Sequence, residues 1–308
     1  MQGFIGKTAK EKSNFNHRII FYQNARTGFS EILKKLSEKY RDLTLLLPGF
    51  IGYSPNEGSG IYDPVLQNNI KHEFYSIDEN VNVITSEYEK IISTATGKIV
   101  VLLVHYYGYL DKNIDELVKI AKKYDAIIIE DCAHALFTDY IDGSCGDYGD
   151  FSIYSLHKML PYQDGGMVKI NTKEFILEDT EYYYNLLEYN LKQISDIRKR
   201  NAKIIERELC GVEGIKILRS TKLYCNQTPQ TFPIIIEKKD KNYLYHTINE
   251  AGYGVVSLYH TMIDSLKNEE IPNEIAHKIL NLPIHQDAHE DDLVMMCDLI
   301  KKLVKDGE

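Results

Sequence analysis

The sequence predicts an α/β fold in its N-terminal half followed by a smaller α+β unit, and three observations support this. Short apolar runs rich in β-branched residues, such as 99–104 and 127–129, are typical of strands buried on both faces of a parallel sheet. Helical stretches with one apolar face alternate with these runs. Beyond about Glu174 a long helical stretch and a few separated strands replace that alternation.

The N-terminal half begins, after a polar leader, with an expected helix over 27–40 and a strand at 45–47. The Gly- and Asn-rich stretch GFIGYSPNEGSGIYDP is too long and too interrupted for a plain turn, so we expect a ligand-facing loop there. The next expected elements are strand HEFYSI (72–77), helix 85–95, strand KIVVLLVH (98–105), helix 113–123, strand DAIIIED (125–131) and strand 151–154, with a Gly-Gly turn at 165–166 into another strand.

The C-terminal half is expected to open with a long helical stretch over 176–209. A strand at TFPIII (231–236), a helix near 242–251 and a final helix near 291–305 follow. We therefore expect a large α/β domain over 1–178 and a small α+β domain over 179–308.

Composition excludes several classes of function. A formal net charge of −9 and a pI near 5.6 argue against a general binder of nucleic acid or anionic membranes, which needs a basic surface. No apolar run is long enough to span a membrane, and the N-terminal residues lack the apolar core of a signal peptide. Five widely spaced cysteines without a CxxC pair indicate no disulfide framework and no metal site. We expect a soluble protein of the cytoplasm.

Three places in the chain carry residues suited to chemistry. Asp131 directly follows a buried strand, where ligands of open α/β sheets bind, although such carboxylates also cap neighbouring helices. Lys158 follows another strand beside a Ser and a Gly-Gly turn, although most lysines are solvated surface groups. The segment Arg26-Thr27-Gly28 precedes a helix whose free N–H groups can hold a phosphate, although it is equally an ordinary helix start.

These segments together resemble the DegT/DnrJ/EryC1/StrS family of sugar aminotransferases, in a short form. The resemblance spans about residues 20–305 and implies the fold-type I architecture of pyridoxal-phosphate enzymes, a three-layer sandwich around a mainly parallel sheet. The strings that carry it are NARTGFSEIL, LLLPGF, VHYYGYLDKNIDELVKIAKKY, IIIEDCAHAL, GDYGDFSIYSLHK, DGGMVKI and ILNLPIHQD.

The resemblance implies roles for the residues around the cofactor, pyridoxal 5'-phosphate. Lys158 would form the Schiff base, and Asp131 would pair with the pyridine nitrogen. His134 would lie beside the ring, although a core histidine with a structural hydrogen bond is the alternative. Phe50 would lie against the ring, with Tyr53 as the alternative.

The resemblance also assigns the cofactor phosphate to Ser155 together with Arg26 and Thr27. It implies an aminotransferase with glutamate as donor and a nucleotide-linked keto sugar as acceptor, in surface polysaccharide or nucleotide-sugar synthesis. A homodimer with the site near its interface is expected.

Two other functions compete with transamination. A sugar dehydratase of this family carries His in place of the lysine, so Lys158 argues against it. A scaffold or partner subunit that has lost turnover is favoured only by the short C-terminal half. The absence of GxGxxG and GxSxG patterns argues against a dinucleotide-binding Rossmann enzyme and a serine hydrolase.

The match to the family pattern has two departures. Two fewer residues separate Ser155 from Lys158 than in the common pattern, which marks a subfamily. The segment after the lysine is also short, and it normally supplies an Asn to the partner subunit's site. Asn185 and Asn190 are candidates for that role, and neither aligns clearly.

Overall fold

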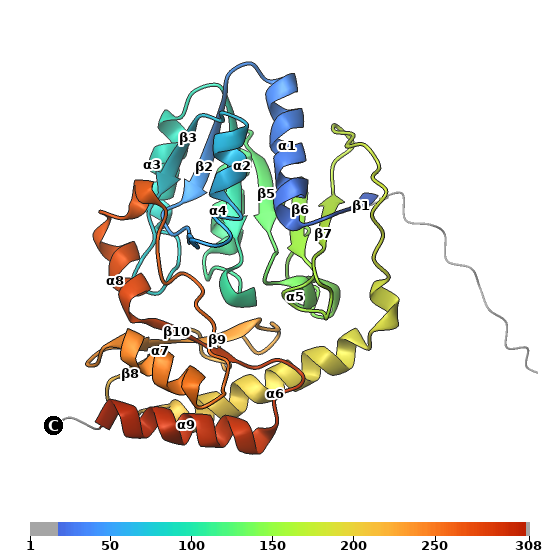
Figure 1. Cartoon of the computed structure of the whole chain (residues 1–308). Coiled ribbons are helices and arrows are strands. Elements are labelled where there is room, and N and C mark those ends of the chain that lie inside the picture. The colour runs from blue at the N-terminus through green and yellow to red at the C-terminus, as the bar shows by residue number, and fades with distance from the viewer. Residues whose placement is uncertain (1–17, 306–308) are drawn as a thin grey trace, which may run out of the picture.

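The computed structural model describes residues 18–305, so the N-terminal leader and residues 306–308 lie outside the described residues. Most of the described chain forms one large sheet flanked by helices, with a smaller sheet below it (Figure 1). The large sheet has the order β1-β7-β6-β5-β4-β2-β3. Its strands are β1 (Arg18–Tyr22), β2 (Leu43–Pro48), β3 (His72–Tyr75), β4 (Lys98–Val104), β5 (Ile127–Asp131), β6 (Phe151–Ser155) and β7 (Gly166–Ile170).

The strands of the large sheet run mainly in one direction. Strands β3, β2, β4, β5 and β6 pair in parallel, whereas β7 is antiparallel to both β6 and β1. The C-terminal ends of the parallel strands therefore share one edge, where ligands of open α/β sheets bind. Asp131 and Ser155 are the last residues of β5 and β6 and lie on this edge.

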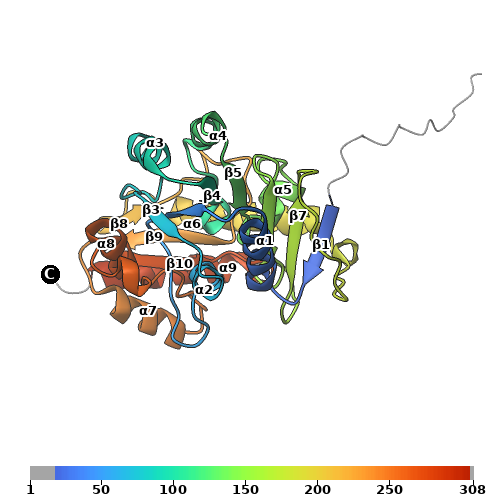
Figure 2. The ribbon, with the colours of Figure 1, turned by 90° about the horizontal axis from the view of Figure 1, so that it is seen from above.

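Helices cover both faces of the large sheet, as Figure 2 shows. Leu45 and Leu47 of β2 pack into the core with α1, whereas Leu46 packs into the other core with α3 and α4. This alternation explains why β2 is apolar throughout. The helices of this part are α1 (Ala25–Lys39), α2 (Tyr62–Gln67), α3 (Thr85–Thr94), α4 (Ile114–Lys123), α5 (Leu136–Tyr140) and the short 3₁₀ helix η1 (Tyr106–Gly108).

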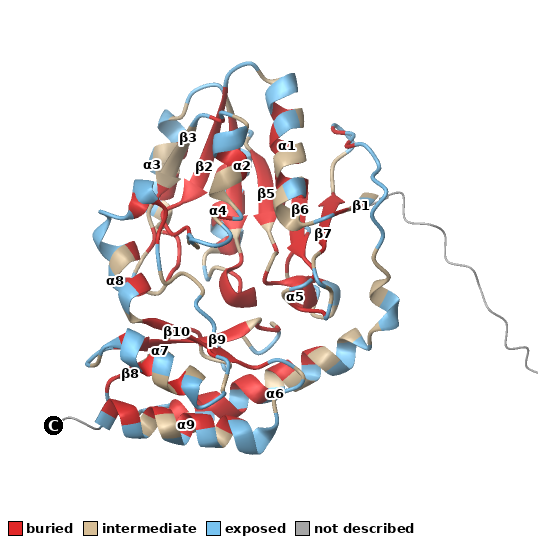
Figure 3. Ribbon diagram, viewed as in Figure 1, coloured by how far each residue is buried: buried red, intermediate tan, exposed pale blue. Residues whose placement is uncertain are grey.

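The C-terminal part is built on a three-stranded antiparallel sheet of order β10-β9-β8. Figure 3 shows the buried faces of α6 and α9 turned toward this sheet, and their apolar side chains form a third core with β9 and β10. Its elements are η2 (Leu186–Glu188), α6 (Leu191–Leu209), β8 (Ile215–Ile217), β9 (Thr231–Ile236), α7 (Lys241–Glu250), η3 (Asp264–Leu266), α8 (Glu270–Lys278), β10 (Ile279–Pro283) and α9 (Glu290–Lys305).

The structure confirms the predicted α/β class and most predicted elements, but the long helix over 176–209 is wrong. The helix begins only at Leu191, where the Asn190 side chain accepts a hydrogen bond from Gln193 N and caps the first turn. The preceding segment is instead attached to β1. The Thr180 hydroxyl donates to Phe21 O, and the rings of Tyr183 and Tyr184 contact the ring of Phe21 edge-on. Tertiary contacts thus override local helix propensity.

None of the helices described between residues 18 and 305 combines the length and apolar character that a membrane span requires.

Close packing between β7 and the start of α1 requires glycine at position 166. A Cβ added to Gly166 would lie 2.1 Å from Asn24 C and 2.3 Å from Asn24 O, both backbone atoms that cannot rotate away. We therefore expect Gly166→Ala to lower the free energy of unfolding by at least about 1–3 kcal/mol. Urea denaturation measures this loss. Gly60→Ala is the matched control, because nothing lies within 4 Å of its added Cβ. Equal stability of the two variants would contradict this account.

Candidate active site

Asp131 ends β5 at the edge where the parallel strands finish. Its Oδ1 accepts a hydrogen bond from Ala133 N at 2.9 Å, which fixes the carboxylate just beyond the strand. Burial raises the pKa of Asp131, while the hydrogen bond from Ala133 N opposes that rise. A buried carboxylate with one backbone donor is suited to bind a further cation or N–H group.

Lys158 and His134 are in direct contact, with 2.9 Å between Lys158 Nζ and His134 Nε2. The other ring nitrogen, Nδ1, accepts a hydrogen bond from Tyr107 N at 3.3 Å. A neutral imidazole that accepts at Nδ1 carries its proton on Nε2, so Nε2 donates and Nζ must accept. The hydrogen-bond pattern therefore assigns a neutral amine to Lys158 and a neutral ring to His134.

The electrostatics of this pair agree with the assignment. Burial lowers the pKa of Lys158 below its ordinary value, and Arg26 acts in the same direction, against the opposing charges of Asp131 and Glu57. Burial also lowers the pKa of His134 well below its usual range, with Lys158 adding to the effect. An uncharged lysine amine at neutral pH is a nucleophile and a base, which is the property that carbonyl chemistry requires.

The predicted phosphate segment lies at the corner where β6, β7 and α1 meet. Ser155 is the cross-strand partner of Gly166, whose Cα packs against the backbone of Asn24 at the start of α1. The Asn24 side chain caps the helix by accepting from Thr27 N and Thr27 Oγ1, both at 3.0 Å. The remaining N–H groups of the first turn, those of Ala25 and Arg26, have no partner inside the helix.

The Arg26 side chain is engaged by the glycine-rich loop rather than by Ser155. Its Nη2 donates to Glu57 O at 2.5 Å, and its Nη1 lies 3.5 Å from Asp63 Oδ2. The Ser155 hydroxyl lies 3.3 Å from His157 Nδ1. The structure therefore brings the backbone of the predicted segment near Ser155 and uses the guanidinium group to hold the loop beside the site.

Phe50 follows β2 at the same edge but has no exposed surface. Its ring stacks on the ring of Tyr259, with centroids 4.9 Å apart and planes 24° apart. The Tyr106 hydroxyl donates to Phe50 O at 2.6 Å and fixes its backbone. Tyr53, the alternative, is 46% exposed on the loop.

Tyr259 was not predicted as a site residue, and it lies in an irregular segment between α7 and η3. Its ring contacts His134, Tyr106 and Tyr107 edge-on. It is one of 23 tyrosines, and no local pattern distinguishes it from the others.

A buried, hydrogen-bonded Glu–His pair lies directly behind Asp131. Glu130 and His105 are 0% and 1% exposed, and His105 Nε2 lies 2.9 Å from Glu130 Oε2. Three backbone N–H groups, those of Gly146, Tyr148 and Gly149, also donate to Glu130 at 2.8–3.0 Å. Burial alone would raise the pKa of Glu130. The hydrogen bonds from His105 and from the backbone N–H groups outweigh that effect and hold the pKa below its ordinary value of 4.5.

Glu130→Gln is expected to lower the free energy of unfolding by about 3 kcal/mol or more at pH 7, because an amide cannot accept from all these donors.

Since the folded pKa of Glu130 is depressed, the contribution of this carboxylate to stability is complete above pH 4.5 and is lost as pH falls through the folded pKa. The variant should therefore lose less stability than wild type on acidification, as urea denaturation at several pH values would show. Glu116→Gln, at an exposed position of α4, is the control; equal acid sensitivity in all three proteins would contradict the prediction.

Two thiols lie close to the same pair. Atoms of His105, Cys132 and Cys145 lie within 4.8 Å of one another, all buried. A thiolate, not a thiol, binds metal, and burial raises the pKa of Cys132 well above its usual range. His105 is bonded to Glu130 through Nε2, and its Nδ1 has no hydrogen-bond partner among the described residues.

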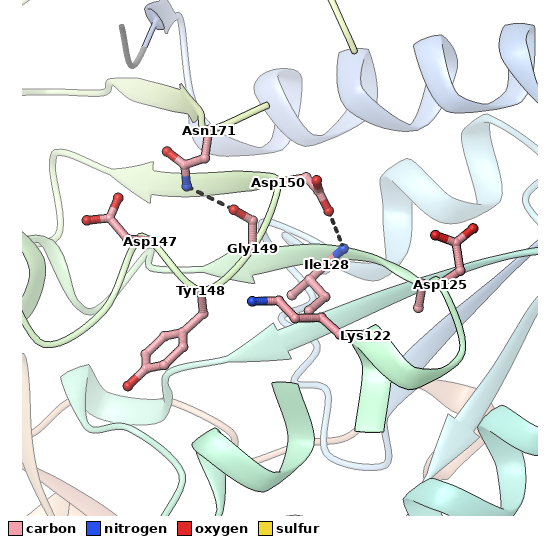
Figure 4. A pocket seen from close by; sticks show the side chains of 9 residues that line it. Lys122, Asp125, Ile128, Asp147, Tyr148, Gly149, Asp150 and Asn171 are labelled. Carbon is pink, nitrogen blue, oxygen red and sulfur yellow. Dashed lines mark hydrogen bonds between the residues drawn. The ribbon is translucent and has the colours of Figure 1, made fainter. Parts of the chain in front are cut away.

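A separate surface hollow opens at the other end of β5 (Figure 4). Asp150 accepts from Ile128 N at 2.9 Å, and Asn171 Nδ2 donates to Gly149 O at 3.0 Å. Lys122 and Asp125 complete its rim. These bonds join the start of β5 to the segments around β6 and β7, so the hollow is explained by strand packing.

Comparison with known proteins shows a family to which part of the chain is similar and solved structures that share its fold. The model of the DegT/DnrJ/EryC1/StrS aminotransferase family matches residues 60–181. The UDP-4-amino-4,6-dideoxy-N-acetyl-beta-L-altrosamine transaminase of Campylobacter jejuni is 24% identical over 283 residues, covering 76% of this chain and 74% of the relative.

Two solved structures have the same fold. S. venezuelae DesV superposes with a TM-score of 0.73 at 15% identity, over 94% of this chain and 85% of that one. E. coli GDP-4-keto-6-deoxy-D-mannose-3-dehydratase, solved with hydrated pyridoxal phosphate, gives 0.70 at 16% identity, over 91% and 87%. The architecture expected from the sequence is therefore confirmed.

Proposed function

We propose that this chain, a member of the DegT/DnrJ/EryC1/StrS aminotransferase family as its sequence predicts, is a pyridoxal-phosphate-dependent enzyme that converts a keto sugar to an amino sugar. One observation carries the proposal. A lysine amine whose pKa is lowered by burial, in contact with a neutral His134, lies at the same sheet edge as the partly buried carboxylate of Asp131.

The residues present fit the cofactor at each of its polar ends. The free N–H groups of Ala25 and Arg26, with the Ser155 hydroxyl, offer donors for a phosphate. Asp131 offers a carboxylate for the protonated ring nitrogen, and Lys158 offers the amine for the aldehyde carbon. These three sets of donors and acceptors come from β5, β6 and α1 and match the chemistry of the group.

Pyridoxal phosphate supplies an electron sink for the pair of electrons left when a proton leaves the substrate carbon next to nitrogen. Asp131, as an anion, would favour protonation of the ring nitrogen and so strengthen that sink. Lys158 would first hold the cofactor and then, through Nζ, carry the proton to and from the reacting carbon. His134 would keep Nζ positioned, since its Nε2–H points at that atom.

Glutamate as amino donor and a nucleotide-linked keto sugar as acceptor belong to the same proposal, with surface polysaccharide or nucleotide-sugar synthesis as the setting. The printed name of the Campylobacter relative, a transaminase of a UDP-linked amino sugar, supports this substrate class. A dehydratase is the alternative, since one structural neighbour is named as one. Lys158 favours amino-group transfer over dehydration, because the dehydratases of the family carry His at this position. Lys158, Asp131 and Ser155 together argue against a scaffold without turnover.

A cytoplasmic homodimer is also proposed. The segment before α6 exposes apolar side chains, because Ile176, Tyr183 and Leu187 are 74%, 76% and 91% exposed among the described residues. Such a surface is typical of a subunit contact. Asn185 and Asn190 each cap a helix in their own chain by accepting from Leu187 N and Gln193 N.

The test is an absorbance titration of the purified chain with pyridoxal phosphate, followed by borohydride reduction, proteolysis and mass mapping. The proposal predicts a visible band whose reduction places the cofactor on Lys158. In a separate, unreduced sample, addition of glutamate should convert the band to that of the pyridoxamine form. A colourless protein, or label spread over surface lysines, would contradict it. Binding without any response to glutamate would reject glutamate as the donor.

A further inference from the structure

Of the two stacked residues Phe50 and Tyr259, only Tyr259 keeps exposed surface. Phe50 is 0% exposed, so no planar ligand reaches its ring without movement of a neighbour. Tyr259 covers it in a near-parallel stack and is itself partly exposed. Tyr259 is therefore the less buried residue of the stack, with Phe50 behind it.

Tyr259 is held in this place by its surroundings. Its backbone has a φ of 58°, a left-handed conformation that is strained for a bulky residue and is typical of functional sites. The segment pairs with the chain after β2, since Tyr53 N donates to Thr261 O and Ile263 N donates to Ile51 O. The Tyr259 ring passes over Gly52, where an added Cβ would lie 3.1 Å from it.

The surroundings of the Tyr259 ring point to the cofactor side of the site. Its ring centroid lies 6.1 Å from that of His134, the residue in contact with Lys158. The charge of Asp131 adds to the effect of burial in raising the pKa of Tyr259, so the hydroxyl lies within the field of that carboxylate. Tyr259 thus lies between the buried Phe50 and the residues proposed to hold the cofactor.

We infer that Tyr259 is the aromatic platform against which the cofactor ring lies, with Phe50 as the support behind it. The inference rests on the proposed function and replaces the role first expected for Phe50. A stacked pair suits this purpose because the inner ring fixes the plane of the outer one, and aromatic faces bind planar rings in offset stacks. Tyr259 is then a cofactor-positioning residue supplied by the C-terminal half of the chain.

The test measures the dissociation constant for pyridoxal phosphate by absorbance titration, together with the circular dichroism of the bound cofactor in its visible band. Tyr259→Asn removes the ring, and Asn tolerates the left-handed backbone, so the fold should remain. We expect binding about 3- to 10-fold weaker and a changed dichroic band. Tyr259→Phe should keep both values near those of wild type. Tyr243→Asn, at an exposed position of α7, is the control.

Unchanged or tighter binding by Tyr259→Asn would overturn the inference, and tighter binding would show instead that the ring obstructs the site. A large loss in Phe50→Leu, with Tyr259→Asn unaffected, would return the role to Phe50. If wild type itself binds no cofactor, the proposed function fails. If wild type binds on Lys158 and only the Tyr259 effect is missing, this inference alone fails.

Discussion

Replacing Lys158 by alanine is expected to lower kcat by about 100- to 10 000-fold and to abolish the borohydride-stable attachment of the cofactor. The large effect follows because one amine has two tasks, holding the cofactor and moving the proton, and the second alone accounts for factors of this size. Steady-state kinetics with glutamate and mass mapping after reduction measure the two losses separately.

Lys158→Arg is the matched control for this prediction. It keeps a positive side chain of similar reach, but a guanidinium does not lose its proton near neutral pH. Both variants should therefore be inactive. In wild type the attachment rate should rise with pH and level off at an apparent pKa below 10.5, because burial lowers the pKa of Lys158 and the free amine is the reactive form. Activity in Lys158→Arg, or a midpoint at or above 10.5, would contradict the assignment of a neutral amine.

The edge of the sheet was the most predictable part of the site. A buried run ending in Glu-Asp, and another ending in Ser155, already place both residues at strand ends, and parallel strands bring such ends together. The first helix was expected over 27–40 and begins two residues earlier, at Ala25, because the side chain of Asn24 caps it. These features depend on residues a few positions apart, which is why the sequence alone indicates them.

Features that depend on distant contacts were not predictable. The stretch 176–190 contains residues compatible with a helix, but the contacts of Thr180 and Tyr184 with β1 draw it across the surface. Tyr259 reaches the site because its segment pairs with the chain after β2, about 200 residues earlier. Hydrophobic periodicity carries no information about either contact.

The division of the chain near residue 178 stays a prediction, and the packing shows why the boundary matters for function. Met262, Ile263 and Ile275, well inside the C-terminal half, pack into the core that α1 forms with the large sheet. These residues flank the segment that carries Tyr259. The C-terminal half therefore contributes both to the large core and to the site. A substitution in that core is expected to displace Tyr259 and so to alter cofactor binding.

Asp131→Asn is expected to lower kcat by about 100- to 1000-fold while leaving the fold intact, because it removes a preorganised charge from the reacting centre. The only hydrogen bond that the carboxylate accepts among the described residues comes from Ala133 N, and an Asn side chain can accept it equally well. Burial already disfavours the Asp131 anion, so its loss should not lower the melting temperature. Glutamate-driven turnover and thermal melts of the same preparations measure the two effects.

The pH dependence of Asp131→Asn separates an electrostatic role from a structural one. In wild type the charge of Asp131 raises the pKa of Lys158 against the effect of burial, so its removal should lower that pKa further. The attachment rate of the variant should therefore reach its plateau at lower pH than in wild type, even though turnover falls. Asp131→Glu keeps the charge at a different reach and should keep the wild-type midpoint. A variant that loses turnover together with its thermal stability, with no shift of the midpoint, would show that Asp131 acts on the fold and not on the reacting centre.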